Sequence, residues 1–420
     1  MDVASRSKIA FVVERYALDE VGEAARRTRA MATAMASRGH DVTVLTTCAR
    51  DPDRWENGVA EGKSSIEGVQ VVRFRLTAVK TEWLGGPAKW LAPYHSAAGR
   101  LWSISLGPAC VGYRRYLDHL GYLFDAVFFT GTWGYLVSEG VRRVRNAVLC
   151  PPAIDDASRV GRHASDLLRA VRAVAVATAS EEQRLRADTK QPWPCPTFIT
   201  GAAPDPLPAM TLRMRRMNLV DGPFLLCVGH HGPAADRLVE AFRFFREAHA
   251  DTPLEDDTGE RMTVRDVRLV LAGDYRFPHA PEQGILSLGP VDDTVRGVLQ
   301  HRALAVVHPD PGNRLPTELL VAWSQGRPTL VHTGAPDLRP MLDVIGKECI
   351  YDSPSTFAAS AASLLSSRSP RRVFGARAKE ALRRTFSPRK LAEGVEQCVR
   401  GVVGRAKGQV VSIDSGSYGS

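Results

Sequence analysis

Two pairs of neighbouring polar residues carry side chains that could take part in chemistry. Asp155 and Asp156 follow an apolar run, and paired carboxylates on a loop could orient a hydroxyl group. His230 and His231 follow a second apolar run, and protonated imidazoles could bind a diphosphate. Each pair also has a plainer interpretation: solvated carboxylates in the first case, and an ordinary loop in the second.

The acidic pair belongs to a region in which strands and helices alternate. The apolar run over residues 9–13 is typical of a strand buried on both faces of a parallel sheet. From Gly22 to Arg38 apolar residues recur at helical spacing, and Gly39 is expected to end this helix. Residues 41–46 form the next apolar strand. This order predicts a right-handed βαβ unit, which begins a doubly wound sheet.

The histidine pair belongs to a second region of the same alternating kind. A proline-rich stretch over residues 189–208 is expected to link the two regions. Beyond it, the pattern predicts strands at 224–229, 267–273, 303–307 and 328–331, helices at 234–249 and 318–326, and a polar insertion at 251–265. Ligands of doubly wound sheets bind at the carboxyl ends of the strands, where both polar pairs fall. The predicted fold class is therefore α/β, with two Rossmann-like doubly wound domains that face a cleft.

Composition narrows the class of partner. The net charge of +9 suits a polyanionic partner, such as nucleic acid, an anionic membrane face or a phosphorylated substrate. The basic residues are dispersed and no nucleic-acid motif is present, so we expect no nucleic-acid partner. No apolar run reaches the roughly 18 residues of a transmembrane helix, and the seven scattered cysteines indicate reduced thiols. We expect a cytoplasmic protein, with the inner face of the membrane as an alternative location.

The segment 83–122 interleaves seven Trp and Tyr residues with basic residues. An aromatic and basic surface could make a peripheral membrane contact or hold a lipid-linked acceptor. The alternative, which we favour, is a pair of helices that packs its aromatic side chains inside the first domain.

Short motifs follow one another along the chain. In the first region they are Arg15-Tyr16, Gly22, the helix that carries Arg26, Arg38-Gly39-His40-Asp41-Val42, residues 46–51, Trp55-Glu56-Asn57, Glu67-Gly68-Val69 and Val72-Arg73-Phe74. In the second they are Val270-Leu271-Ala272-Gly273, Leu288-Gly289-Pro290-Val291, Ala322-Trp323 and Gly326-Arg327-Pro328. In order and spacing they resemble the family-4 retaining glycosyltransferases (glycosyl transferases group 1), over roughly residues 8–403.

The resemblance implies a GT-B fold and its division of the chain. An acceptor domain is expected at 1–205 and a donor domain, which binds the nucleotide-sugar, at 206–386. A helix at 387–404 is expected to pack back on the first domain, and residues 405–420 are expected to form a flexible tail.

The resemblance also implies where the donor diphosphate would bind. The family begins its second domain with Gly-Arg and then Lys-Gly, whose cations suit phosphate oxygens. Here His230 stands at the arginine position, and Arg237 is the nearest replacement for the lysine. The expected donor-binding residues are His230, His231, Arg237, Val291, Asn313, Arg314 and Glu318.

In the family two glutamates, spaced Glu-x7-Glu, contact the donor sugar and the ribose. Alignment on the motifs that follow them puts Asn313 and Val321 at these positions. A second register, Asp310-x7-Glu318, keeps the spacing but breaks that alignment. Glu318 could instead be a solvated or capping residue near a helix start.

On the acceptor side, the resemblance implies a catalytic histidine that this chain lacks. Asp155 and Asn313 are then the catalytic candidates, and Asp156 lies on the acceptor side. Of the family's glycine pair near the first helix, Gly22 remains and Glu23 replaces the second glycine. A backbone that approaches a substrate closely favours glycine at such positions.

The function implied is a glycosyltransferase of the hexosyltransferase type, which transfers a sugar from a nucleotide-diphosphate donor to an acceptor hydroxyl. The acceptor would be a glycan, a lipid-linked molecule or a small molecule. Because the donor-site motifs are degenerate, the alternative is a catalytically inactive GT-B homologue that binds an acceptor or a partner glycosyltransferase. No cofactor or metal is expected, although Asp51 and Asp53 have the spacing of a metal motif in another transferase fold.

Overall fold

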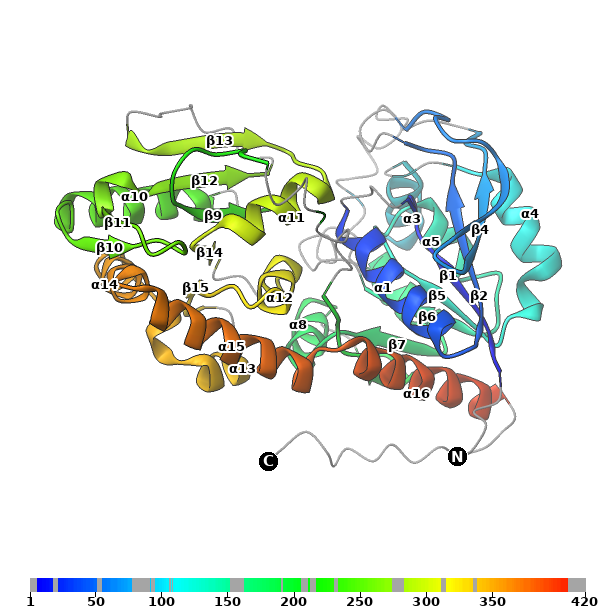
Figure 1. Cartoon of the computed structure of the whole chain (residues 1–420). Coiled ribbons are helices and arrows are strands. Elements are labelled where there is room, and N and C mark those ends of the chain that lie inside the picture. The colour runs from blue at the N-terminus through cyan, green and yellow to red at the C-terminus, as the bar shows by residue number, and fades with distance from the viewer. Residues whose placement is uncertain are drawn as a thin grey trace. The chain divides into compact units, whose positions relative to one another are not determined.

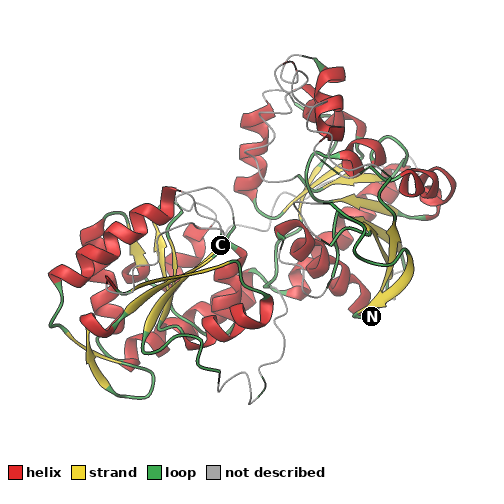
Figure 2. Cartoon of the chain, turned by 90° about the horizontal axis from the view of Figure 1, so that it is seen from above, coloured by secondary structure: helices red, strands yellow, loops and turns green. Residues whose placement is uncertain are grey.

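The computed structural model describes residues 6–17, 22–50, 55–77, 91, 95–105, 107, 109–151, 162–189, 192–204, 211, 217–229, 233–273, 283–310, 315–334 and 338–406. The chain forms two compact units (Figures 1 and 2). The first contains the residues up to Ala202 and those from Pro388 onward, and the second contains Ala203–Ser387. The first boundary lies three residues before the one expected at residue 205.

One eight-stranded sheet forms the centre of the first unit, in the order β3-β4-β2-β1-β5-β6-β7-β8. Its strands are β1 (Lys8–Val12), β2 (Asp41–Thr47), β3 (Gly62–Ile66), β4 (Val69–Phe74), β5 (Ala126–Phe129), β6 (Ala147–Leu149), β7 (Ala173–Val176) and β8 (Thr197–Ile199). Among the described strands of this sheet, only β3 pairs antiparallel, with β4. Ile9 of β1 pairs with both Val42 and Ala126, so β1 lies between β2 and β5. The topological switch point is therefore at the carboxyl ends of β1 and β5.

Helices cover this sheet (Figure 1). They are α1 (Glu23–Ser37), α3 (Ser96–Ser105), α4 (Val111–Leu120), α5 (Tyr135–Gly140), α7 (Arg162–Ala170), α8 (Ala179–Thr189) and α16 (Pro388–Ala406). The apolar periodicity of α1 puts Met31 and Met35, one turn apart, in the core with no exposed surface. Helix α16 packs against α1: Glu396 accepts hydrogen bonds from Arg38 Nε at 2.6 Å and lies 3.2 Å from His40 Nε2.

The second unit contains a six-stranded parallel sheet in the order β13-β12-β9-β14-β15-β16. Its strands are β9 (Phe224–Val228), β12 (Arg268–Ala272), β13 (Ile285–Gly289), β14 (Ala305–His308), β15 (Thr329–His332) and β16 (Ile350–Tyr351). Its helices are α10 (Pro233–Ala248), α11 (Asp293–Arg302), α12 (Thr317–Ser324), α13 (Arg339–Ile345), α14 (Pro354–Leu365) and α15 (Arg368–Thr385). The α/β prediction with two Rossmann-like sheets is confirmed, and here the switch point lies between β9 and β14.

Two segments differ from the expectation. The proline-rich stretch at 189–208 contains β8, which pairs with β7 in the register Val174↔Thr197. Its β-branched and aromatic residues suit an edge strand, where flanking prolines are tolerated. The polar insertion at 251–265 folds into a hairpin of β10 (Pro253–Glu255) and β11 (Arg261–Thr263), followed by the 3-10 turn η3 (Val264–Asp266).

The described part of the aromatic segment packs inside the first unit. Trp102 on α3 and Tyr113 on α4 are buried, and the Tyr113 hydroxyl donates to the Leu136 carbonyl at 2.8 Å. Tyr122 is the exception, with 79% of its surface exposed. None of the helices within the described ranges combines the length and hydropathy that crossing a bilayer requires.

Candidate active site

At the carboxyl edge of the second sheet, polar side chains follow three neighbouring strands. His308 is the last residue of β14, and its Nδ1 lies 3.1 Å from Oε1 of Glu318, in the first turn of α12. The buried Tyr351 hydroxyl donates to the His308 carbonyl at 3.4 Å. His332 ends β15, and its ring meets the Tyr351 ring edge-on at 5.5 Å. The parallel strands thus bring residues far apart in the sequence to one edge.

Glu318 is neither a helix cap nor a freely solvated residue. Pro316 is the N-cap of α12, without a side-chain hydrogen bond, and only 16% of the Glu318 side chain is exposed. Val321, at the second glutamate position in the other register, is completely buried in the core. Of the two candidates for the second glutamate position, only Glu318 therefore places a polar side chain at the carboxyl edge. Asp310, its counterpart in that register, follows β14 two residues after His308.

A cavity of about 110 Å³ lies between α10 and the ends of β14, β15 and β16. Arg237, Pro309, His332 and Tyr351 line it. Burial and the Arg237 guanidinium both lower the pKa of His332, so the ring is neutral near pH 7. Because His332 Nδ1 accepts a hydrogen bond from the Gly334 N–H at 3.2 Å, its proton lies on Nε2. The cavity therefore offers a cation and a neutral donor, both suited to anionic oxygens.

The carboxyl ends of β9 and β12 approach each other through backbone alone. A Cβ on Gly273 would lie 2.0 Å from the Gly229 carbonyl oxygen, and both glycines have positive φ angles. The Gly229 N–H donates to the Ala272 carbonyl at 2.9 Å. Only glycine permits this spacing, and the histidine pair follows Gly229 directly in the sequence.

The first sheet has a different polar group at its switch point. Glu14 follows β1 by two residues, and its Oε1 accepts a hydrogen bond from the Thr132 hydroxyl, beyond the end of β5. An added Cβ on Gly134 would lie 3.3 Å from that oxygen. The Glu14 carbonyl accepts from the Thr47 hydroxyl at 2.7 Å. Sequence reasoning missed Glu14, because it becomes a site candidate only once the strand order puts β1 beside β5.

The predicted acceptor-side residues that the structure describes lie at the start of α1. Gly22 is the N-cap of this helix, and Glu23 is in its first turn. Gly22 has a φ of −68°, which any residue can adopt, so the local backbone does not require glycine. Both belong to the first unit, as Glu14 does.

Val291 lies in the loop between β13 and α11, one residue before Asp292, whose side chain caps α11 by accepting from the Val295 N–H at 2.8 Å. Arg237 and Glu318 share the carboxyl edge of the second sheet. Six predicted site residues lie outside the described residues: Asp155, Asp156, His230, His231, Asn313 and Arg314. Among the residues described, no group of three or more His, Cys, Asp or Glu side chains could hold a metal ion.

No protein-family model matches the chain, and a search of curated proteins also gives no match. Solved structures do match over nearly the full length. A sucrose-phosphate synthase from Thermosynechococcus elongatus covers 95% of this chain and 100% of its own, with a TM-score of 0.63 and 14% identity. HepE from Anabaena, in complex with UDP and glucose, covers 93% of this chain and 99% of its own, with a TM-score of 0.59 and 12% identity.

A third structure is WaaG, a glycosyltransferase involved in lipopolysaccharide biosynthesis. It covers 94% of this chain and 100% of its own, with a TM-score of 0.57 and 14% identity. The chain has the GT-B fold. The GT-B prediction is thereby confirmed, whereas membership of family 4 stays a prediction. In this fold the carboxyl edges described above are the two places where substrates are expected.

Proposed function

We propose that the protein is a glycosyltransferase that moves a sugar from a nucleotide-diphosphate donor to an acceptor hydroxyl. The proposal is carried by one observation: the His308–Glu318 pair lies at the carboxyl edge of the second sheet, beside the cavity that Arg237 and His332 line. Ligands of doubly wound sheets bind at this edge. The proposal is supported by the GT-B neighbours, one of which holds UDP and glucose.

Each group at this edge would contact a different part of the donor. The Glu318 carboxylate, held by His308, would accept hydrogen bonds from sugar or ribose hydroxyls. Arg237 and His332 would contact the diphosphate, since both residues line the cavity and both carry N–H donors. In this proposal His230, His231, Asn313, Arg314 and the Val291 backbone complete the donor contacts.

The reaction asks the protein mainly for positioning and for stabilisation of charge on the departing diphosphate. The bond from the anomeric carbon to the diphosphate oxygen breaks, the bond to the acceptor oxygen forms, and the hydroxyl proton is released. In the first unit, Glu14 would accept a hydrogen bond from that hydroxyl, with Asp155, Asp156, Gly22 and Glu23 as the other acceptor-side residues. The proposed acceptor is a glycan, a lipid-linked molecule or a small molecule. Cytoplasmic location, with the inner membrane face as the alternative, stays a prediction.

One observation favours the second candidate, a catalytically inactive homologue that binds an acceptor or a partner glycosyltransferase. In the register fixed by the downstream motifs, the second glutamate position is occupied by Val321, which is completely buried. A buried valine offers no hydrogen bond to a ribose.

Calorimetric titration with UDP-, GDP- and TDP-sugars distinguishes the two candidates. One of these donors should bind, and Glu318→Gln should weaken its binding by about tenfold, because it removes a charge-assisted hydrogen bond. Glu247→Gln is the matched control, since Glu247 is exposed on α10 and does not line the cavity. A folded protein that releases no heat with any of the donors would leave the inactive homologue as the better candidate.

A further inference from the structure

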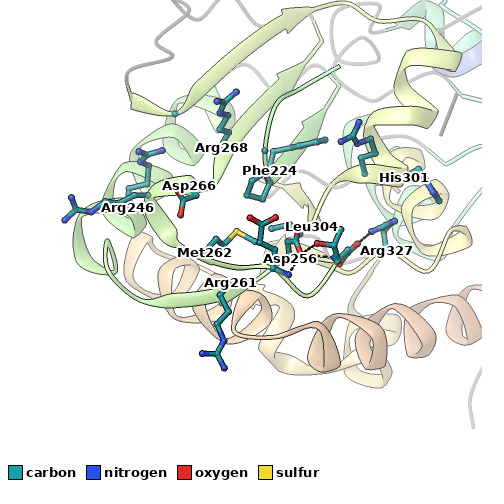
Figure 3. Close-up of a pocket in the computed structure, with 18 residues that line it drawn as sticks. Phe224, Arg246, Asp256, Arg261, Met262, Asp266, Arg268, His301, Leu304 and Arg327 are labelled. Carbon is teal, nitrogen blue, oxygen red and sulfur yellow. Dashed lines mark hydrogen bonds and ion pairs between the residues drawn. The ribbon is translucent and has the colours of Figure 1, made fainter. Parts of the chain in front are cut away.

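A cavity of about 950 Å³ opens at the amino edge of the second sheet, the edge at which its parallel strands begin. The first residues of β9 and β12, the hairpin β10–β11 and the last turns of α10 and α11 line it. Figure 3 shows Arg246 and Arg268 on one side of Phe224, with His301 and Arg327 on the other. The site at the carboxyl edge uses none of these residues, so this cavity is a separate feature of the same unit.

Three arginines on the walls form no ion pair within the part of the chain that the structure describes. Arg246 Nη1 donates to the Val267 carbonyl at 3.0 Å, and Arg302 Nη1 donates to the Met217 carbonyl at 2.7 Å. Arg268 is half-buried and forms no side-chain hydrogen bond or ion pair within the described ranges. A guanidinium has five N–H donors, so most of the donors of these three arginines have no acceptor among the described residues and could bind a ligand.

Three of the four acidic groups on the same walls are already engaged. Asp256 accepts hydrogen bonds from the backbone and hydroxyl of Thr258 at 2.8 and 2.6 Å, and Asp257 forms ion pairs with two arginines. Asp266 caps the turn η3 through Oδ2. The fourth lining carboxylate, that of Glu260, is exposed. The cavity therefore has more cationic N–H donors than acceptors to receive them, and a bound anion would supply the missing acceptors.

The Arg246 guanidinium lies against the backbone of a glycine, where no other residue type would leave room for it. A Cβ on Gly284 would lie 1.9 Å from Arg246 Nη1, and Gly284 has a φ of +71°. Burial lowers the pKa of Arg246, and Asp266 offsets only part of this effect. A charged guanidinium is thus kept where solvent is partly excluded and no ion pair neutralises it, which is an environment in which a bound anion is stabilised.

We propose that this cavity binds a small phosphorylated molecule, with its phosphate groups on Arg246, Arg268 and Arg302. Guanidinium groups match phosphate oxygens in geometry and charge. Phe224, Met262 and Leu304 supply an apolar part of the lining for the organic part of the ligand. The volume, about 950 Å³, is that of cavities which enclose small molecules. The proposal does not depend on glycosyl transfer.

Calorimetric titration of the full chain with inorganic tripolyphosphate at low salt tests it. We expect one binding site per chain in the wild-type protein, and Arg268→Gln should weaken binding by about tenfold or more. Arg377→Gln is the matched control, because Arg377 is exposed on α15 and lies outside the cavity. Arg237→Gln reports on the carboxyl edge instead. Thermal melts verify that each variant is folded.

Loss of binding in Arg268→Gln alone supports the cavity. Absence of binding to the wild-type protein overturns the proposal, as does an equal loss in Arg377→Gln, which would indicate diffuse electrostatic attraction. Loss in Arg237→Gln but not in Arg268→Gln would assign the anion to the carboxyl edge and also overturns it. A parallel arm uses vesicles of phosphatidylglycerol: sensitivity to Arg268→Gln there, without tripolyphosphate binding, would identify a lipid headgroup and overturn the assignment to a soluble ligand.

Discussion

The carboxyl edges of the two sheets occupy equivalent places in their units, and each carries a glutamate, but the residues around that glutamate differ. At the first, the Glu14 carboxylate accepts a hydrogen bond from the Thr132 hydroxyl and lies close to the Gly134 backbone. At the second, two imidazoles and Arg237 accompany Glu318. A hydroxyl-bearing, uncharged molecule suits the first edge, and an anionic one suits the second. Under the proposed function, the same topology would therefore provide sites for two chemically different substrates.

The largest expected effect concerns the backbone contact that shapes the second edge. Gly273→Ala should lower the free energy of unfolding by about 3 kcal/mol or more, because its Cβ would overlap the Gly229 carbonyl. Chemical denaturation of the purified protein measures this.

Gly39→Ala is the control, since Gly39 also has a positive φ but no atom lies within 4 Å of its would-be Cβ. It should cost only about 1 kcal/mol, the strain of the left-handed conformation. Equal effects of the two substitutions would show that the contact between Gly229 and Gly273 does not shape this edge.

The stability of the first unit should depend on pH through one buried histidine. His163, on α7, is fully buried and bonds Ser138 of α5 at 2.9 Å. Burial, aided by Arg142, lowers its pKa to about 4 from the ordinary 6.5. Between pH 6.5 and 4, His163 is therefore protonated in the unfolded chain but stays neutral in the folded chain.

Stability from His163 is thus complete above pH 6.5 and declines toward pH 4. Between pH 7.5 and 5 the free energy of unfolding should fall by about 2 kcal/mol from this group. Denaturant titrations of the wild-type protein and of His163→Gln at both pH values measure the difference. A variant with an unchanged pH slope would contradict the assignment.

Neutralising Glu14 and Glu318 in separate variants tests whether the two edges bind different substrates. Glu14→Gln should raise the KM for the acceptor by about tenfold, through loss of a charge-assisted hydrogen bond, and leave donor affinity unchanged. Glu318→Gln should show the reverse. Product formation with a panel of hydroxyl-bearing acceptors, together with donor calorimetry, measures both. If each variant weakened both substrates equally, the division of labour between the edges would be wrong.

The smallest effect is expected at the rim of the second edge. Arg237 is exposed, so Arg237→Gln should weaken donor binding only about threefold, and less at high salt. Arg377→Gln, far from this cavity on α15, should change nothing. Titrations of the donor at two salt concentrations measure this effect. A loss of donor affinity that does not depend on salt would mean that Arg237 makes a desolvated contact instead.

The parts that the sequence predicted well are those with long apolar periodicity. β1 and α1 were expected within one or two residues of their bounds, because β1 is a buried apolar run and α1 buries one apolar face at helical spacing. β8 and β16 have three and two residues, too few for any period to show, and β8 is flanked by prolines. The His308–Glu318 contact depends on how α12 packs against the end of β14, and the Glu14–Thr132 contact, across 118 residues, depends on the order of strands in the sheet.

Helix α16 has a practical consequence for dissecting the molecule. Through Glu396 it bonds Arg38 and His40, which belong to the first unit, although it follows the second unit in the chain. A protein cut after Ser387 would therefore lose part of its N-terminal half rather than its C-terminal half. Residues 203–387, in contrast, are continuous and are the natural fragment to express alone. A stop codon that removes α16 should therefore destabilise the first unit, which is built mainly from the N-terminal half of the chain.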